Sequence, residues 1–260
     1  MAAGTAYTRA LSPRLADCQL THLAAAPIDI ARAQAQHTAY ERALADAGLA
    51  VERLPPLPDH PDGVFVEDTA LILGRDAVIT RPGAASRAGE TASTAAGLAG
   101  AFAVHRLGAG TLDGGDVLPI GATLYVGRSA RTSDEGIAAL AALVGPLGYA
   151  VVPVEAQGCL HLKSGVTFAG PDGAGTPVLL HHPDWVASAP FADVEPLAVA
   201  PDEPNAANVL RVGARLFVSA EAPRTAERLA RRGFDVILLD VSELHKAESG
   251  LTCMSLISEG

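Results

Sequence analysis

The sequence predicts an α/β fold assembled from five similar units of strand, strand, helix and strand. Helical stretches alternate with short apolar strands, and a turn glycine separates each clear helix from the strand after it. Polar or reactive residues also recur 45 to 48 positions apart, near the start of the first strand of each unit. These residues are Asp68, Asp116, His161, Asn208 and Cys253.

The helix and its following strand are clearest in four stretches. In the first, 29–49, Asp29 is a suitable N-cap, and Gly48 ends the helix ahead of the strand AVERL. The same plan returns at 86–107, 134–154 and 224–240. Each copy is a helix that feeds one short hydrophobic strand.

Two short apolar strands joined by a glycine-containing turn complete the unit. They are read in VEDTALILGRDAVITR, GGDVLPIGATLYVGR and ANVLRVGARLFVSA. The stretch HLKSGVTFAGPDGAGTPVLLHH has the same layout with a longer turn. Its following helix is the least regular one, because two prolines interrupt 181–194.

Near-equal spacing favours a repeat architecture, in which no unit buries its apolar face alone. A closed ring would bring the five strand starts to one axis, with a last strand near 251–258 completing its unit against the N-terminal segment. Ordinary crossovers in an open doubly wound sheet have a similar period, so the spacing alone leaves both topologies open. We expect residues 1–260 to form one domain, since this length suffices for one full core.

Composition narrows the class of protein. The chain is globular, with 49% apolar and 18% charged residues, and its net charge of −10 disfavours nucleic acid as a partner. The first residues lack the apolar core of a secretory signal, and glycines and prolines break the one long apolar run at 137–154, so we expect no membrane span. Three cysteines without paired spacing fit reduced thiols in the cytoplasm.

Convergent strand starts would gather a thiol, an imidazole and several carboxylates. Cys253 and His161 with an acid form a set for nucleophilic catalysis. Crowded carboxylates would bind a cation, which favours attack on a positively charged carbon such as that of a guanidinium. The candidate acids are Glu67, Asp68, Asp113 and Asp116.

Each of these residues also has a structural interpretation. Asp113 and Asp116 are typical turn residues, and His161 could be a buried core histidine. The string VFVED is harder to explain in that way, because adjacent acids at the end of an apolar strand carry a desolvation cost unless they meet a cation.

A zinc site is the competing interpretation of the same residues. Cys159 and His161 alternate on one predicted strand face, and Cys253 or Asp113 could complete a tetrahedral set. No Cys-x-x-Cys pair supports this, and we predict neither a metal nor another cofactor. The stretch GAGTLDGGD lacks the glycine spacing and the helix start of a dinucleotide-binding loop.

Several ordered motifs together resemble the dimethylarginine dimethylaminohydrolase family of the guanidino-modifying superfamily. The resemblance runs from LTH at 20–22 to the C-terminus and implies a five-bladed α/β propeller around a central active site. Its motifs are DGVFVEDTAL (62–71), ITRPGAASR (79–87), TLDGGDVL (111–118), GRSARTS (127–133), LHLKSG (160–165), AAN (206–208) and LTCMSL (251–256).

The resemblance implies hydrolysis of Nω-methylated arginines, asymmetric dimethylarginine and monomethylarginine, to citrulline and dimethylamine or methylamine. Cys253 would attack the guanidinium carbon and form a covalent thiouronium. His161 would protonate the departing amine and then deprotonate the hydrolytic water. Asp113 would orient His161, at a position where the family has Glu or Asp.

Residues near the thiol would bind the guanidinium end of the substrate. The resemblance places Glu67 and Asp68 against its nitrogens, while the carbonyl of Ala247 and the residue Thr252 would line the pocket. We expect these acids to raise the pKa of the Cys253 thiol, so that the cationic substrate itself helps to ionise it.

A second group of residues would hold the amino-acid end of the substrate, which is a small cationic amino acid. Arg87 and Arg131 match the arginines that bind the α-carboxylate, by charge-assisted hydrogen bonds. Asp62 and the carbonyl of Leu20 would hold the α-ammonium.

Other activities would keep the same core residues. An arginine deiminase or a hydrolase of another substituted guanidine differs only in substrate, and an amidinotransferase would pass the amidino group to an amine. A zinc-binding or inert propeller relative is the alternative without this catalysis. The sequence does not predict the oligomeric state.

Overall fold

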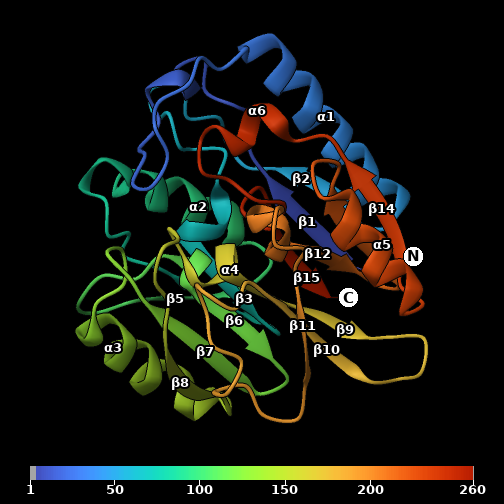
Figure 1. The fold of residues 1–260 in the computed structure, drawn as a ribbon. Helices are drawn as coiled ribbons and strands as arrows, with labels where there is room; N and C mark the ends of the chain where they lie inside the picture. The colour runs from blue at the N-terminus through green and yellow to red at the C-terminus, as the bar shows by residue number, and fades with distance from the viewer. Residues whose placement is uncertain (1–3, 260) are drawn as a thin grey trace.

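Five sheets of three strands surround the centre of the molecule (Figure 1). The structure is a computed structural model that describes residues 4–259. In each sheet the middle strand pairs antiparallel with one neighbour and parallel with the other.

One sheet combines the two ends of the chain, and each of the other four is built from a continuous part of it. In the first, β1 (Gly4–Thr8) lies between β15 (Leu256–Glu259) and β2 (Ala50–Arg53). The other sheets, in the order of their strands, are β3 (Ala70–Leu73), β4 (Asp76–Ile79) and β5 (Ala103–Arg106); β6 (Val117–Ile120), β7 (Thr123–Arg128) and β8 (Ala150–Glu155); β9 (Val166–Pro171), β10 (Pro177–His181) and β11 (Glu195–Ala198); and β12 (Leu210–Val212), β13 (Arg215–Ser219) and β14 (Asp235–Leu239).

Four sheets have the predicted helix between the middle strand and its parallel neighbour. These helices are α1 (Ile30–Asp46), α2 (Glu90–Leu98), α3 (Asp134–Val144) and α5 (Pro223–Arg231). The sheet β9–β11 departs from the predicted unit, since residues 182–194 form turns and bends with no helix. Pro183 and Pro190 lie in that stretch and cannot donate backbone hydrogen bonds to a helix.

Helix α1 begins and ends at the residues that the local signals indicate. The side chain of Asp29 accepts a hydrogen bond from the backbone N–H of Arg32 at 3.0 Å and caps the first turn. Gly48 follows the helix with φ of +99°, a conformation that favours glycine. The helix buries Ala33, Tyr40 and Leu44 against the sheet formed by the two chain ends.

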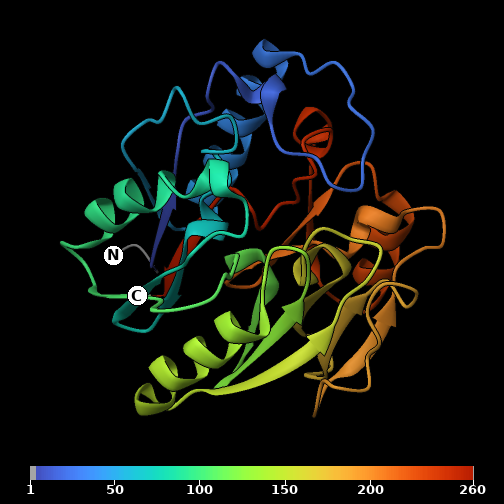
Figure 2. The same cartoon turned by 90° about the vertical axis from the view of Figure 1, so that its left-hand side faces the viewer.

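The two ends of the chain close the ring. Strand β15 runs antiparallel to β1, with Tyr7 opposite Leu256 and Gly4 opposite Glu259. Figure 2 shows the chain passing once around the molecule, so that its first and last strands, β1 and β15, lie side by side. The five sheets therefore form a closed propeller-like α/β fold, and the open-sheet alternative is wrong.

The C-terminal strand begins later than the sequence suggested. Residues 250–254 form a bend and a turn, and β15 starts only at Leu256, so Cys253 lies on a turn and not on a strand. The Thr252 N–H donates to the Asn208 side chain at 3.0 Å, and the Gly250 N–H donates to the Cys253 sulfur at 3.3 Å. Both bonds use backbone groups that a strand ladder would otherwise need.

A short helical segment or turn stands ahead of the first strand of every sheet. These are η2 (Val66–Thr69), η4 (Gly114–Asp116), α4 (Leu162–Gly165), η6 (Pro204–Ala207) and the turn at 250–254. Segment η2 contacts η4, η4 contacts α4, and α4 contacts η6. The equally spaced polar residues of the sequence are therefore brought together at the centre.

The apolar cores lie between neighbouring sheets and under the helices. The remaining short helices are η1 (Leu15–Asp17), η3 (Ala85–Arg87), η5 (Gly145–Leu147) and α6 (Ser242–His245). Across residues 4–259, no helix combines the length and the apolar character that crossing a membrane requires.

Candidate active site

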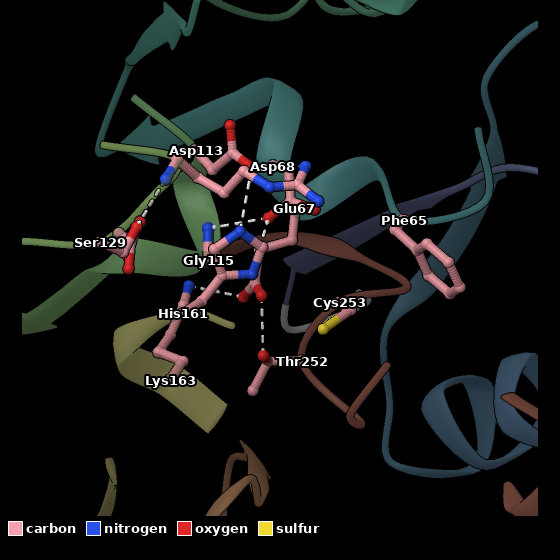
Figure 3. A network of polar contacts seen from close by, with 12 residues as sticks. Phe65, Glu67, Asp68, Asp113, Gly115, Ser129, His161, Lys163, Thr252 and Cys253 are labelled. Carbon is pink, nitrogen blue, oxygen red and sulfur yellow. Dashed lines mark hydrogen bonds and ion pairs between the residues drawn. The ribbon is translucent and has the colours of Figure 1, made fainter. Parts of the chain in front are cut away.

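One small cavity at the centre collects seven of the residues singled out in the sequence. They are Asp62, Asp68, Arg87, Arg131, His161, Ala247 and Cys253. In Figure 3 the sulfur of Cys253 lies on the side of the cysteine that faces His161 and the surrounding carboxylates. Thiol, imidazole and acids, separated widely along the chain, thus border the same space.

His161 is held between two carboxylates. Its Nε2 lies 2.9 Å from Oδ2 of Asp113, and its Nδ1 lies 3.7 Å from Oδ1 of Asp68. Burial alone would lower the pKa of His161, but the charge of Asp68, the bond to Asp113 and the charge of Asp116 raise it to about 9. A pKa in this range keeps the imidazole protonated at neutral pH.

Asp113 is fully buried and fixed by its neighbours. Its Oδ1 accepts a hydrogen bond from the Gly83 N–H at 2.8 Å, which leaves Oδ2 for His161. Its own N–H donates to Thr132 Oγ1 at 3.2 Å, and Arg131 Nη1 lies 3.9 Å from Oδ2. The short aspartate side chain reaches the imidazole directly.

Cys253 is buried and carries a protonated thiol at neutral pH. Burial is the main cause that raises its pKa, and the charges of Glu67 and Asp68 raise it further, to about 12. The Gly250 N–H and the charge of Lys163 act in the opposite direction. The expected upward shift of the thiol pKa is confirmed, with desolvation as the larger cause.

Glu67 and Asp68 are adjacent in sequence but have different surroundings. Glu67 accepts from Lys163 Nζ at 2.6 Å and from Thr252 Oγ1 at 2.8 Å, and neither Glu67 nor Thr252 is among the residues that line the cavity. Asp68 lines the cavity and accepts the Gly115 N–H at 3.0 Å (Figure 3). Glu67 thus holds the turn before Cys253 through the Thr252 hydroxyl.

Lys163 is a site residue that sequence reasoning missed. It stands two positions after His161 in the motif LHLKSG, and its side chain is buried beside Glu67. The available signal was a lysine two positions after His161 in a stretch expected to be buried, since a buried lysine needs a carboxylate partner.

Arg87 is more deeply involved in the structure than expected. It is buried and forms an ion pair with Asp68, and its Nη2 donates to the carboxylate of Glu90 at 2.8 Å and to the Phe65 carbonyl at 2.8 Å. Burial would raise the pKa of Asp68, but His161 and Arg87 together lower it, so this carboxylate stays ionised. Arg87 borders the cavity while it also orders the acids around it.

A segment near the N-terminus covers the cavity. Asp62 accepts the backbone N–H of Gln19 at 3.2 Å, and Arg131 donates to the hydroxyl of Thr21 at 3.2 Å. The carboxylate of Glu248 accepts the N–H groups of three successive residues, Thr21, His22 and Leu23. Leu20 itself is half-buried and does not line the cavity, whereas its neighbour Gln19 does.

Asp68, Asp113 and His161 offer ligand atoms within 4.8 Å of one another, a spacing that a metal ion could use. The direct 2.9 Å contact between His161 Nε2 and Asp113 Oδ2 already pairs the nitrogen with an acceptor. We therefore assign these groups to an imidazole–carboxylate pair. Cys159, the other thiol in the zinc alternative, donates to the His161 carbonyl at 3.3 Å and does not line this cavity.

The closed five-sheet fold with a cysteine, a histidine and acids at its centre defines the guanidino-modifying class of α/β propeller enzymes. The chain is 43% identical to the N(G),N(G)-dimethylarginine dimethylaminohydrolase of Streptomyces coelicolor over 96% of this chain and 95% of that protein. It is 38% identical to the enzyme of the same name from Pseudomonas aeruginosa, over 88% and 89% of the two chains. The chain therefore belongs to the dimethylarginine dimethylaminohydrolase family.

Solved structures agree with this assignment. A cysteine-to-serine mutant of the Pseudomonas aeruginosa enzyme complexed with citrulline superposes with a TM-score of 0.92 at 35% identity, covering 99% of this chain and 100% of that chain. The N-terminal domain of a cyanobacterial arginine dihydrolase has a TM-score of 0.79 at 19% identity, over 98% and 97% of the chains, and shares the fold. No protein-family model matches the chain.

Proposed function

We propose that this enzyme hydrolyses Nω-methylated arginines to citrulline and dimethylamine or methylamine, through a covalent adduct on Cys253. One observation carries the proposal: Cys253, His161 and Asp68 border one cavity in a chain that shares 43% identity with a dimethylarginine dimethylaminohydrolase. The carboxylates of Asp62 and Asp68 at the cavity wall suit a cationic substrate.

The first step is ionisation of the thiol. A guanidinium placed against Asp68 brings positive charge next to Cys253, which lowers the raised pKa of the thiol, and the proton leaves to solvent. The thiolate attacks the guanidinium carbon and forms a carbon–sulfur bond. His161, protonated because its pKa is raised to about 9, donates its proton to the departing amine as the carbon–nitrogen bond breaks.

The second step removes the adduct. The neutral imidazole of His161 takes a proton from water, and the hydroxide attacks the thiouronium carbon. The carbon–sulfur bond then breaks, the remaining hydroxyl proton of the adduct passes to the departing sulfur, and citrulline leaves with the Cys253 thiol restored. Asp113 keeps Nε2 of His161 in one orientation through both proton transfers, because its other oxygen is fixed by the Gly83 N–H.

The cavity walls have groups of the right charge for the amino-acid end of the substrate. Arg131 and Arg87 would bind the α-carboxylate, and Asp62 with the Leu20 carbonyl would bind the α-ammonium. Arg131 is the more available of the two arginines, since Arg87 already pairs with Asp68 and Glu90. The Ala247 carbonyl would border the reacting carbon.

Asp68 is the direct partner that we propose for the guanidinium nitrogens. Glu67 was expected to share this role, and it would have to exchange a bond with Thr252 or Lys163 to do so. Glu67 and Thr252 thus support the reacting end of the pocket from behind the turn that holds Cys253.

The partner that this chemistry requires is a small cationic amino acid, and no cofactor enters any step. The nucleophilic thiol must stay reduced, and Cys18, Cys159 and Cys253 are free thiols, which supports a cytoplasmic location. The net charge of −10 argues against nucleic acid as a further partner.

Product identity tests the proposal. The purified enzyme is incubated separately with asymmetric dimethylarginine, monomethylarginine and arginine, and citrulline and the released amine are both measured. We expect citrulline with dimethylamine or methylamine, and Cys253→Ser should abolish turnover while the thermal transition is retained. Ammonia from arginine alone would indicate a deiminase, a new guanidino compound with an added amine would indicate an amidinotransferase, and no turnover of any substrate would contradict the proposed function.

A further inference from the structure

Asp116 is a fully buried carboxylate that none of the proposed chemical steps uses. It lies at the end of η4 and does not line the cavity. Its Oδ1 accepts the Leu162 N–H at 2.8 Å, and its Oδ2 accepts the hydroxyls of Ser129 at 2.6 Å and Thr132 at 2.7 Å. Burial raises the pKa of the Asp116 carboxyl, whereas the charge of His161 and the three hydrogen-bond donors act in the opposite direction.

Each oxygen of Asp116 reaches one partner of the imidazole–carboxylate pair. Leu162 directly follows His161, so the bond to its N–H fixes the backbone that holds the imidazole. Thr132 Oγ1 accepts the N–H of Asp113 and donates its proton to Asp116, so this hydroxyl fixes the backbone of Asp113. One carboxylate thus connects both residues of the 2.9 Å contact.

The backbone packs so closely around this carboxylate that the geometry leaves little room for adjustment. A Cβ at Gly127 would lie 2.8 Å from Oδ1 of Asp116 and 2.8 Å from Cβ of Leu162. A Cβ at Gly115 would lie 2.7 Å from Nδ1 of His161. Glycine at these positions lets η4 approach the imidazole and lets β7 approach Asp116 and Leu162.

We propose that Asp116 is a positioning residue that sets the orientation of His161 relative to Asp113, a role that rests on the proposed function of this pair in proton transfer. It acts through the Leu162 N–H and the Thr132 hydroxyl and never touches the substrate. The reaction depends on this alignment because His161 must reach both the departing amine and the hydrolytic water.

The charge of Asp116 has a second effect, on the proton of His161. It is one of the acids that raise the pKa of the imidazole, so its removal lowers that pKa and the alkaline limb of the turnover profile moves to lower pH. Several segments pack around His161 and carry charged or titratable side chains. These side chains are Asp68, Asp113, Asp116, Arg87, Arg131, Lys163, Glu67 and Cys253.

The test compares Asp116→Asn with a matched control, Glu203→Gln. Glu203 is also a buried carboxylate, and it accepts the N–H groups of Arg224 and Thr225 at 2.8 Å each, away from the cavity. For Asp116→Asn we expect kcat to fall by about tenfold or more, with a smaller change in KM and the alkaline limb at lower pH. Glu203→Gln should keep the wild-type profile even where its thermal stability falls by as much.

A second measurement does not depend on turnover. Histidine side chains labelled with ¹⁵N are titrated by NMR in the wild type and in Asp116→Asn, and His161→Gln identifies the signal of His161. We expect its titration midpoint at lower pH in Asp116→Asn. An unchanged midpoint would overturn the proposal, even if no guanidino substrate is hydrolysed and the proposed function itself fails.

Thr132 provides a milder variant should Asp116→Asn fail to fold. Thr132→Val removes the hydroxyl that joins Asp113 to Asp116, and Thr132→Ser restores it. The proposal requires a lower kcat for Thr132→Val, recovery by Thr132→Ser, and little change in KM. Equal kcat in both variants would contradict it.

Discussion

Lys163 and Glu67 form a buried ion pair of 2.6 Å that joins α4 to η2, next to the turn that holds Cys253. The second oxygen of Glu67 accepts the hydroxyl of Thr252, the residue before Cys253. The positive charge of Lys163 thus lies near the thiol and acts to lower its pKa, although Lys163 does not line the cavity.

This pair predicts a loss of stability when one partner is removed. Lys163→Met leaves the carboxylate of Glu67 buried and unpaired, which costs about 3–5 kcal/mol in the free energy of unfolding. Urea denaturation measures it. Lys163→Met with Glu67→Gln should recover a large part of the loss, and equal stability of the single and the double variant would contradict the assignment.

Substrate binding should ionise Cys253. The pKa of the free thiol is raised to about 12, so the thiolate fraction is small at neutral pH and increases tenfold with each pH unit until that value is approached. Titration of the ultraviolet absorbance of the thiolate, with Cys253→Ser as the blank, should show no ionisation near pH 6 to 8 in the free enzyme. A non-hydrolysed cationic amidine should move the titration to lower pH; a thiol already ionised near pH 6 without it would refute the idea.

The two arginines of the cavity should respond differently to truncation. Arg131→Ala removes a charged hydrogen-bond donor and should weaken substrate binding by roughly 1.5–3 kcal/mol, with a small effect on folding. Arg87→Ala leaves Asp68 and Glu90 buried without their cation, so it should also destabilise the fold by about 3–5 kcal/mol. Product inhibition by citrulline and urea denaturation, measured on both variants, separate the two effects. Equal stability of the two variants would contradict this difference.

Glu248 should control how the N-terminal segment covers the site. Its carboxylate accepts three successive N–H groups at 21–23, and these groups lose their partner in Glu248→Ala. We expect faster proteolytic cleavage in that segment and a higher KM. Glu227→Ala removes an exposed glutamate that pairs with Arg231 on α5, and this control should change neither. Unchanged cleavage and KM in Glu248→Ala would exclude this covering role.

His37 predicts an acid-sensitive step in stability. Burial lowers its pKa to about 4, below the ordinary value near 6.5, and its Nε2 has no hydrogen-bond partner among the described residues. The unfolded chain binds this proton more readily, so stability is undiminished above about pH 6.5 and falls as the pH decreases towards 4. The free energy of unfolding of His37→Leu, measured over this range, should depend less on pH than that of the wild type. Parallel curves would exclude His37 as the cause.

Much of the fold could be predicted because its signals are local. The helix at α1 followed from an N-cap at Asp29 and a stop at Gly48, and both are observed. The sheet β9–β11 lacks the helix of the other units, and the stretch where that helix would lie contains prolines at 183 and 190. The strand expected near 251–258 was shortened, because Asn208 binds the Thr252 N–H from 44 residues away and holds a turn.

The sequence by itself determined the five-unit plan and the types of polar residue at its centre, since helix and turn signals are local and the spacing of the repeat can be counted along the chain. Only the tertiary structure decided which acid faces the cavity. Glu67 and Asp68 are adjacent carboxylates that the sequence does not distinguish. Lys163, 96 residues from Glu67, binds Glu67, while Asp68 lies beside His161. Desolvation and pairing of buried charges depend on groups brought together from different sheets, and no local pattern contains that information.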